Sequence, residues 1–152
     1  MRIGSANHLS YLHQSGVGLI EVLVAVLVLS IGLLGLAGLQ LRTLRDNQSA
    51  LERGVAVIET QAIADAMRAD RINASNGLFD ITLTDDKPTD LSTFANAALE
   101  AWRSNLVEGS LGDDATGQVD CNGFLCTIIV QWDDSRGTGG SVTQQVSTQV
   151  QL

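Results

Sequence analysis

The sequence is short of basic residues, and this shortage excludes one class of function. Its 152 residues contain 9 lysine and arginine residues against 17 aspartate and glutamate residues, for a net charge of −8. A nucleic-acid-binding protein needs a basic patch to neutralise phosphates. Here the basic residues lie scattered among acidic ones from Arg42 to Arg136. We therefore expect no nucleic-acid partner.

Histidine and cysteine are also scarce: His8 and His13 stand in the first 16 residues, and Cys121 and Cys126 near the other end. Two cysteines without a nearby histidine cannot complete a tetrahedral zinc site. No Ser/His/Asp or Cys/His set forms outside the first 16 residues either. We expect no metal, no cofactor and no enzymatic activity. The cysteine pair favours a disulfide in an oxidising compartment, with two buried free thiols as the alternative.

A charge-free run of 20 residues, from Val22 to Leu41, is what the sequence does contain. It is long enough for a helix of about 30 Å that crosses a membrane. A secretory signal peptide cut after Gly35 and Ala37 is the alternative, but the run exceeds the usual h-region of about 7–15 residues. The positive-inside rule, applied to the arginines that follow the run, would place the C-terminus in the cytoplasm. We expect the opposite orientation, because the preceding tail is short and the cysteines suit an oxidising space.

Glu21 stands at the edge of this run, five residues after Gly16. A carboxylate in hydrocarbon costs on the order of 2–3 kcal/mol or more, and no basic residue lies one helical turn away. A cut between Gly16 and Val17 would create an α-amine with a pKa of about 7.7–8.0. That amine could pair with Glu21 of the same helix or of a neighbouring subunit, and such pairing would set the register between helices.

The segment from Gly16 to Ala25, GVGLIEVLVA, resembles the class III signal of type IV prepilins, in which prepilin peptidase cuts after glycine and methylates the new N-terminal residue. The resemblance implies that Gly16 precedes the cut, that Val17 becomes the N-methylated residue, and that Glu21 docks a neighbouring subunit. The family usually has phenylalanine where this chain has Val17. This difference bears on the methylation of residue 17 and not on the cleavage after Gly16.

The resemblance also implies a function and a location. The chain would be a minor pilin of the bacterial inner membrane, with one membrane pass, a periplasmic C-terminal domain and a place in the pilus once assembled. Its partners would be prepilin peptidase, other minor pilins, the major pilin and the inner-membrane assembly platform. One alternative is a minor pseudopilin of a type II secretion system. Another is a bitopic membrane protein or secreted binding domain that never enters a fibre.

The predicted fold is α+β and type IV pilin-like, with a long N-terminal hydrophobic helix packed on a small C-terminal antiparallel sheet. We expect a leader at 1–16, an assembly helix at 17–41, its amphipathic continuation at 42–76 and an α/β head at 77–152. Asn73, Asn76 and Gly77 are the expected helix terminators. The periodicity predicts that one stripe of the continuation packs on the sheet. Its members are Leu44, Leu51, Val55, Ile58, Ala62 and Ala66.

The head is predicted to contain a second helix and an antiparallel sheet. The helix spans about Asp90 to Val107, with Thr89 or Asp90 as its N-cap, and four residues at fourfold spacing point to the core. These are Phe94, Ala98, Trp102 and Leu106. Two strands follow, which alternate in the way that half-buried strands do. Their inward residues are Phe124, Cys126, Ile128, Val130 and Trp132 in the first, and Val142, Val146 and Val150 in the second.

The hairpin around the cysteines has two possible turns. A two-residue turn at Asn122 and Gly123 would leave Cys126 opposite Val119, whereas a direct bridge from Cys121 needs a four-residue tip. We favour the bridge, which could add up to about 2–3 kcal/mol through loop closure. Three aspartate pairs lack the spacing of an EF-hand and are predicted to lie in solvated loops. They are Asp85-Asp86, Asp113-Asp114 and Asp133-Asp134.

Overall fold

The structure is a computed structural model that describes Gly16, residues 18–109 and residues 111–152. Most of the predicted leader, and Val17 itself, lie outside the described residues. Contacts divide the chain into two units, one ending at Leu39 and the other spanning Gln40–Leu152. We describe each unit by itself.

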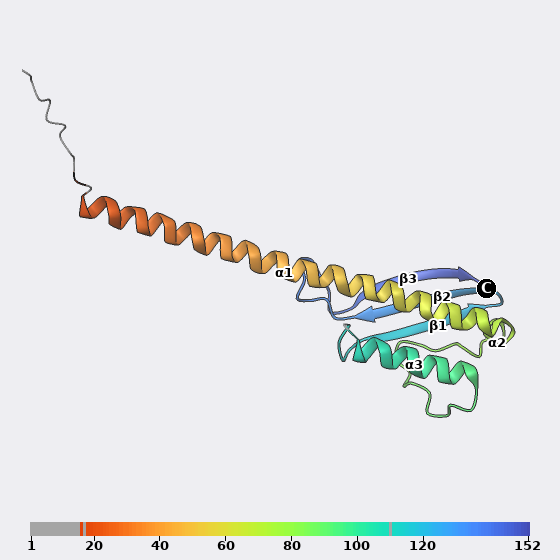
Figure 1. Ribbon diagram of the computed structural model, residues 1–152. Coiled ribbons are helices and arrows are strands. Elements are labelled where there is room, and N and C mark those ends of the chain that lie inside the picture. Colours follow the sequence, from red (N-terminus) through yellow and green to blue (C-terminus); the bar gives the residue numbers. More distant parts are fainter. Residues whose placement is uncertain (1–15, 17, 110) are drawn as a thin grey trace, which may run out of the picture. The chain divides into compact units, whose positions relative to one another are not determined.

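The long helix α1 runs from Leu19 to Ala69 (Figure 1). The backbone leaves the helical region at Asp70, with φ −124° and ψ 54°, so that a short helix α2 (Arg71–Ser75) follows as a separate element. Gly77 then adopts φ 82°, a left-handed conformation that favours glycine after a helix. The predicted helical continuation at 42–76 is thus divided in two, because the sequence analysis missed the break at Asp70.

The buried face of α1 is not the one that we predicted. Leu44, Leu51 and Ile58 remain 65%, 61% and 66% exposed, and Ala62 is also exposed, whereas Val55 and Ala66 are only partly buried against the core. The face that packs in the head lies on another side of the helix, and half of its buried residues are small. Its buried members are Glu52, Ala56, Thr60, Ile63, Ala64 and Met67.

Helix α3 spans Phe94–Glu108, so the predicted start near residue 90 was wrong. Thr93 is the N-cap, and its side chain accepts a hydrogen bond of 3.2 Å from the Asn96 backbone N–H. Asp90 instead accepts from the Ser92 backbone N–H at 3.0 Å, in a turn that precedes the helix. The inward placement is confirmed for two of the four predicted residues, which are Trp102 and Leu106. Of the others, Ala98 is partly buried and Phe94 is 53% exposed.

Three antiparallel strands form the sheet in the order β1-β2-β3: β1 (Thr116–Asn122), β2 (Leu125–Trp132) and β3 (Gln144–Gln151). The predicted alternation is confirmed in β2 from Cys126 to Trp132, whose even-numbered residues are all buried. Phe124, also predicted to point inward, precedes β2 in the turn and is 40% exposed, so that prediction was wrong. Val142, predicted to point inward, precedes β3 and is exposed. The α+β class, a long helix with a small antiparallel sheet, is thus confirmed (Figure 1).

Helix α3 packs on the sheet and is tied to α1. The Trp102 indole N–H donates to the Glu59 backbone carbonyl at 3.0 Å. A Cβ at Gly117 of β1 would collide with the Trp102 ring, so this position needs glycine for the close approach. The Arg103 guanidinium donates to three backbone carbonyls and so joins the segment before α3 to the sheet. The carbonyls belong to Thr82, Asp85 and Gly117.

Candidate functional site

The predicted processing site lies at the beginning of α1. The Gly18 carbonyl accepts hydrogen bonds from the Glu21 and Val22 backbone N–H groups at 3.0 and 3.3 Å, so the helix begins directly after Gly18. Gly16 is described and exposed, whereas Val17, the proposed methylated residue, lies outside the described residues. In sequence, the predicted scissile bond thus stands two residues before the first residue of the helix.

Glu21 lies in the first turn of α1 and is exposed. An acidic side chain there interacts favourably with the positive end of the helix dipole, typically by about 0.3–1 kcal/mol at an exposed site. No described residue forms an ion pair with Glu21. The carboxylate thus has one local stabilising role and is still available to a cation that the described part of the chain does not supply.

An apolar surface follows Glu21 along the helix. Every large apolar side chain between Leu19 and Leu41 is exposed. By length and composition this helix could cross a membrane. Exposed apolar area of this extent is unfavourable in water. The helix is therefore suited to lipid or to contact with other helices.

The same apolar character extends beyond the charge-free run. Leu44, Leu51 and Ile58 recur every seven residues on the side of α1 that the head leaves uncovered. Repeats of seven keep residues near one line of a helix. Sequence reasoning found this stripe but assigned it to the core. In the structure it is a free surface of the described chain.

Two buried carboxylates anchor the loop between β2 and β3 to α1, and sequence reasoning missed both. Asp134, predicted to lie in a solvated loop, is only 2% exposed, and its Oδ2 accepts from Ser49 Oγ at 2.7 Å. Glu52, also 2% exposed, accepts from Gln48 at 3.1 Å and from Arg136 at 3.4 Å. The partners are distant in sequence, so no local pattern could have revealed the link.

An exposed contact accompanies these two. The Thr138 backbone N–H donates to Asp46 Oδ1 at 3.2 Å, and hydrogen bonding from Thr138 lowers the pKa of Asp46. Charged acceptors bind such donors more strongly than neutral ones. The loop is thus held at three points along α1.

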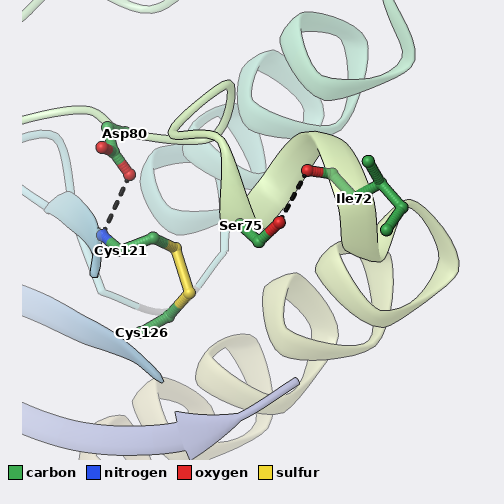
Figure 2. The surroundings of a disulfide bond; sticks show 5 residues. All are labelled: Ile72, Ser75, Asp80, Cys121 and Cys126. Carbon is green, nitrogen blue, oxygen red and sulfur yellow. Dashed lines mark hydrogen bonds between the residues drawn. A yellow bond between two sulfur atoms is a disulfide. The ribbon is translucent and has the colours of Figure 1, made fainter. Parts of the chain in front are cut away.

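Cys121 and Cys126 form a disulfide between directly opposed residues of β1 and β2 (Figure 2), with a Cα–Cα distance of 4.1 Å. The Asp80 carboxylate accepts a hydrogen bond of 3.0 Å from the Cys121 backbone N–H. Burial raises the pKa of Asp80, and the nearby Asp120 carboxylate raises it further. Asn122 pairs with Leu125, so only Gly123 and Phe124 form the turn, and the four-residue tip predicted for the bridged hairpin was wrong. This hairpin fixes the end of the sheet.

The described residues contain no group of three or more histidine, cysteine, aspartate or glutamate side chains that could hold a metal. His8 and His13 lie outside the described residues.

One comparison with known proteins identifies this region. Residues 12–37 match the family described as the prokaryotic N-terminal methylation motif. Comparison with curated proteins and with solved structures gives no match. The matched segment contains Gly16, Val17, Glu21 and the first part of α1. The chain therefore carries, at residues 12–37, the N-terminal methylation motif typical of type IV pilin-like and pseudopilin-like proteins.

Proposed function

We propose that this chain is a minor type IV pilin that joins other minor pilins in a complex that primes pilus assembly. The methylation motif supports processing by prepilin peptidase. The observation that carries the proposal is the apolar helix surface that follows the motif. The chain's own head leaves this surface uncovered. It consists of the large apolar side chains from Leu19 to Leu41, followed by Leu44, Leu51 and Ile58. A monomer in water gains nothing from such a surface, whereas a bundle of such helices buries it.

The proposed processing has three steps. Prepilin peptidase cuts between Gly16 and Val17 and removes a leader at 1–16. The new α-amine of Val17 is methylated and, as a cation at neutral pH, pairs with Glu21 of a neighbouring subunit. Residues 17–41 then act as the assembly helix, continued by 42–76, while residues 77–152 form a periplasmic head. Before assembly the protein resides in the inner membrane; afterwards it belongs to the pilus, together with the major pilin.

Within the family, the chain resembles the minor pilin PilV most. The resemblance rests on the run LIEVLVAVLVLSIGLLGLAGLQ from Leu19 to Gln40. Further similar positions are the segment Ala66–Arg71, Trp102 and the segment Val130–Trp132. The minor pseudopilin GspI shares the LxEVLVA pattern at the start of that run, in which the second position varies. The neighbourhood of the gene, pilus or secretion genes, would distinguish the two.

Mass spectrometry of the mature protein tests the proposal. We expect the protein isolated from its native membrane to begin at Val17 and to carry one methyl group on that nitrogen. A protein with an intact leader, or one cut near Ala37, would contradict the proposal and would support the bitopic or secreted alternative.

A further inference from the structure

Gly54 lies in the middle of α1, and no contact within its own unit of the chain explains why it is glycine. Every other glycine of the unit Gln40–Leu152 either has a positive φ or lies where a Cβ would come within 3 Å of a neighbouring atom. At Gly54 a Cβ would meet nothing within 4 Å, and the residue is exposed. A glycine inside a helix costs about 1 kcal/mol relative to alanine. A contact with another molecule, for which glycine permits a close approach, would offset this cost.

Gly54 belongs to a seam on the outer side of α1 that repeats every seven residues. Its positions are alternately three and four residues apart, as in the contact face of a coiled coil. One set of positions holds large apolar side chains, and the other holds one glycine and two amide side chains. The first set is Leu44, Leu51 and Ile58, and the second is Asn47, Gly54 and Gln61. All six residues are exposed.

The charged residues of this stretch of α1 avoid the seam. Only uncharged residues flank it between Leu44 and Ala62, and they are Gln48, Val55 and Ala62 on one side and Ala50 and Val57 on the other. The charged residues lie on the remaining positions, towards the face that packs in the head. They are Arg45, Asp46, Glu52, Arg53 and Glu59. A second helix could therefore lie along the seam and meet neither a charge nor the head.

We propose that this seam pairs with the same seam of a second copy of the chain, in parallel and in register. The proposal rests on the membrane anchoring in the proposed function and adds the partner. The apolar run directly precedes the seam, so two copies anchored in one membrane present their seams in the same direction and at the same height. In this register Leu51 and Ile58 of the second copy pack on either side of Gly54, where a larger side chain would hold the helices apart.

The polar members of the seam favour a second copy over an unrelated helix. An amide side chain contains both donors and an acceptor, so Asn47 can bond to Asn47 of the second copy, and Gln61 to Gln61. Polar residues of this kind inside an apolar seam specify the register of parallel helices. The whole chain carries a net charge of −8, and two such molecules meet here where neither has a charged side chain.

Oxidative cross-linking of the full chain in its native membrane tests the register. We expect Asn47→Cys to form a disulfide-linked dimer, because the two new thiols face each other across the seam. Arg45→Cys is the matched control. It is exposed, lies only two residues away and faces away from the seam, beyond the Cβ–Cβ distance of about 3.5–4.5 Å that a disulfide needs. Cys121 and Cys126 are already bonded to each other.

A several-fold excess of dimer for Asn47→Cys over Arg45→Cys supports the proposal. Co-expression of two differently tagged copies shows whether the product contains both. Equal cross-linking of the two variants, no cross-linking of Asn47→Cys, or a product that contains a different protein in place of the second copy would overturn it.

Enlargement of Gly54 tests the close approach. In the Asn47→Cys background, Gly54→Leu should lower cross-linking to the level of Arg45→Cys, whereas Gly54→Ala should retain most of it. Both changes raise helix propensity by a similar amount, so a role in helix flexibility would make their effects equal. Cross-linking that survives Gly54→Leu, or that Gly54→Ala abolishes as completely, would therefore contradict the proposal. An unchanged tryptophan emission spectrum checks the fold, because Trp102 and Trp132 are buried in the head.

Mass spectrometry of the N-terminus in the same membranes separates this proposal from the proposed function. A chain that begins at a methylated Val17 but gives no dimer overturns only the pairing of the seams. A chain that gives the dimer but keeps its leader supports the pairing and contradicts the proposed processing.

Discussion

Ser49 Oγ lies 2.7 Å from Asp134 Oδ2 and donates a hydrogen bond to it across 85 residues of sequence. Arg53 approaches the same oxygen at 3.3 Å. The Arg53 side chain is half exposed whereas the Asp134 side chain is buried, so the bond from Ser49 is the better shielded of the two. This pair joins the loop after β2 to the middle of α1 and is one of several contacts that hold the head on the helix.

Replacement of Asp134 by alanine should destabilise the head. The Ser49 hydroxyl and the Arg53 guanidinium would lose their acceptor, and the loss of a charged partner in a buried site typically costs about 1–3 kcal/mol. Urea unfolding of the full chain in detergent, followed by tryptophan fluorescence, measures the effect. Asp113→Ala, an exposed aspartate in another loop, is the control and should stay within about 0.5 kcal/mol. Equal stability of the two variants would show that the anchor contributes nothing.

Replacement of Glu21 by alanine should separate processing from assembly. The cut after Gly16 does not need the carboxylate, so leader removal should proceed, but the α-amine of a neighbouring subunit would lose its partner. Incorporation into a pilus complex, measured in sheared pilus fractions, should fall. Normal piliation in a strain that depends on this protein would argue against the docking role of Glu21.

Replacement of Gly16 by leucine should block processing. A bulky side chain immediately before the scissile bond would not fit a peptidase that recognises glycine there. Full-length precursor should accumulate and migrate more slowly than the mature form on a denaturing gel. Gly18→Ala, two residues away, serves as the control for a general effect on the segment. If Gly16→Leu yields a mature form of normal size, the assigned cleavage position is wrong.

The stability of the head should depend on pH through Glu59. Burial raises the pKa of this carboxyl, and its Oε2 is buried with no hydrogen-bond partner among the described residues. The folded state therefore holds this proton more tightly than the unfolded state, whose pKa is about 4.3. The resulting stabilisation is present below that value and is lost as the pH rises through the folded pKa.

The variant Glu59→Gln should accordingly be more stable than the parent at neutral pH and lose that advantage in acid. Asp46→Asn should show the opposite sign, because the lowered pKa of Asp46 gives a stabilisation that is present above its unfolded pKa and lost as the pH falls. Urea midpoints measured from pH 3 to pH 8 for both variants check this. A constant difference between Glu59→Gln and the parent would contradict the assignment.

Two features could be predicted from the sequence: the central strand β2 and the buried side of α3. In each of them the apolar residues recur at one regular spacing. Ile128 and Val130 alternate with exposed or half-buried neighbours, and Trp102 and Leu106 are four residues apart. Each element has one apolar face, so the period alone determines which face is buried.

The buried face of α1 could not be predicted in that way, because this helix has two apolar faces. Leu51 and Ile58 belong to the more hydrophobic face, which was therefore predicted to be buried. The head instead covers the face that contains Ala56 and Ala64. A helical wheel ranks faces by hydrophobicity and contains no information on which partner each face meets. Asp134 was missed for a related reason, since its partner Ser49 is remote in the sequence.

The two faces of α1 also differ in which changes each can tolerate. On the buried side, Ala56 and Ala64 are fully buried in the core cluster, so even a conservative enlargement of either side chain would have to displace packed neighbours. On the outer side, Leu51 can become isoleucine or methionine while keeping the apolar character that the proposed contact with a neighbouring helix requires. The same stretch of helix therefore has two requirements: side chains of a fixed volume on the buried side, and apolar side chains of any shape on the outer side. Among related chains, we expect few different residues at the buried positions and many different apolar residues at the outer ones.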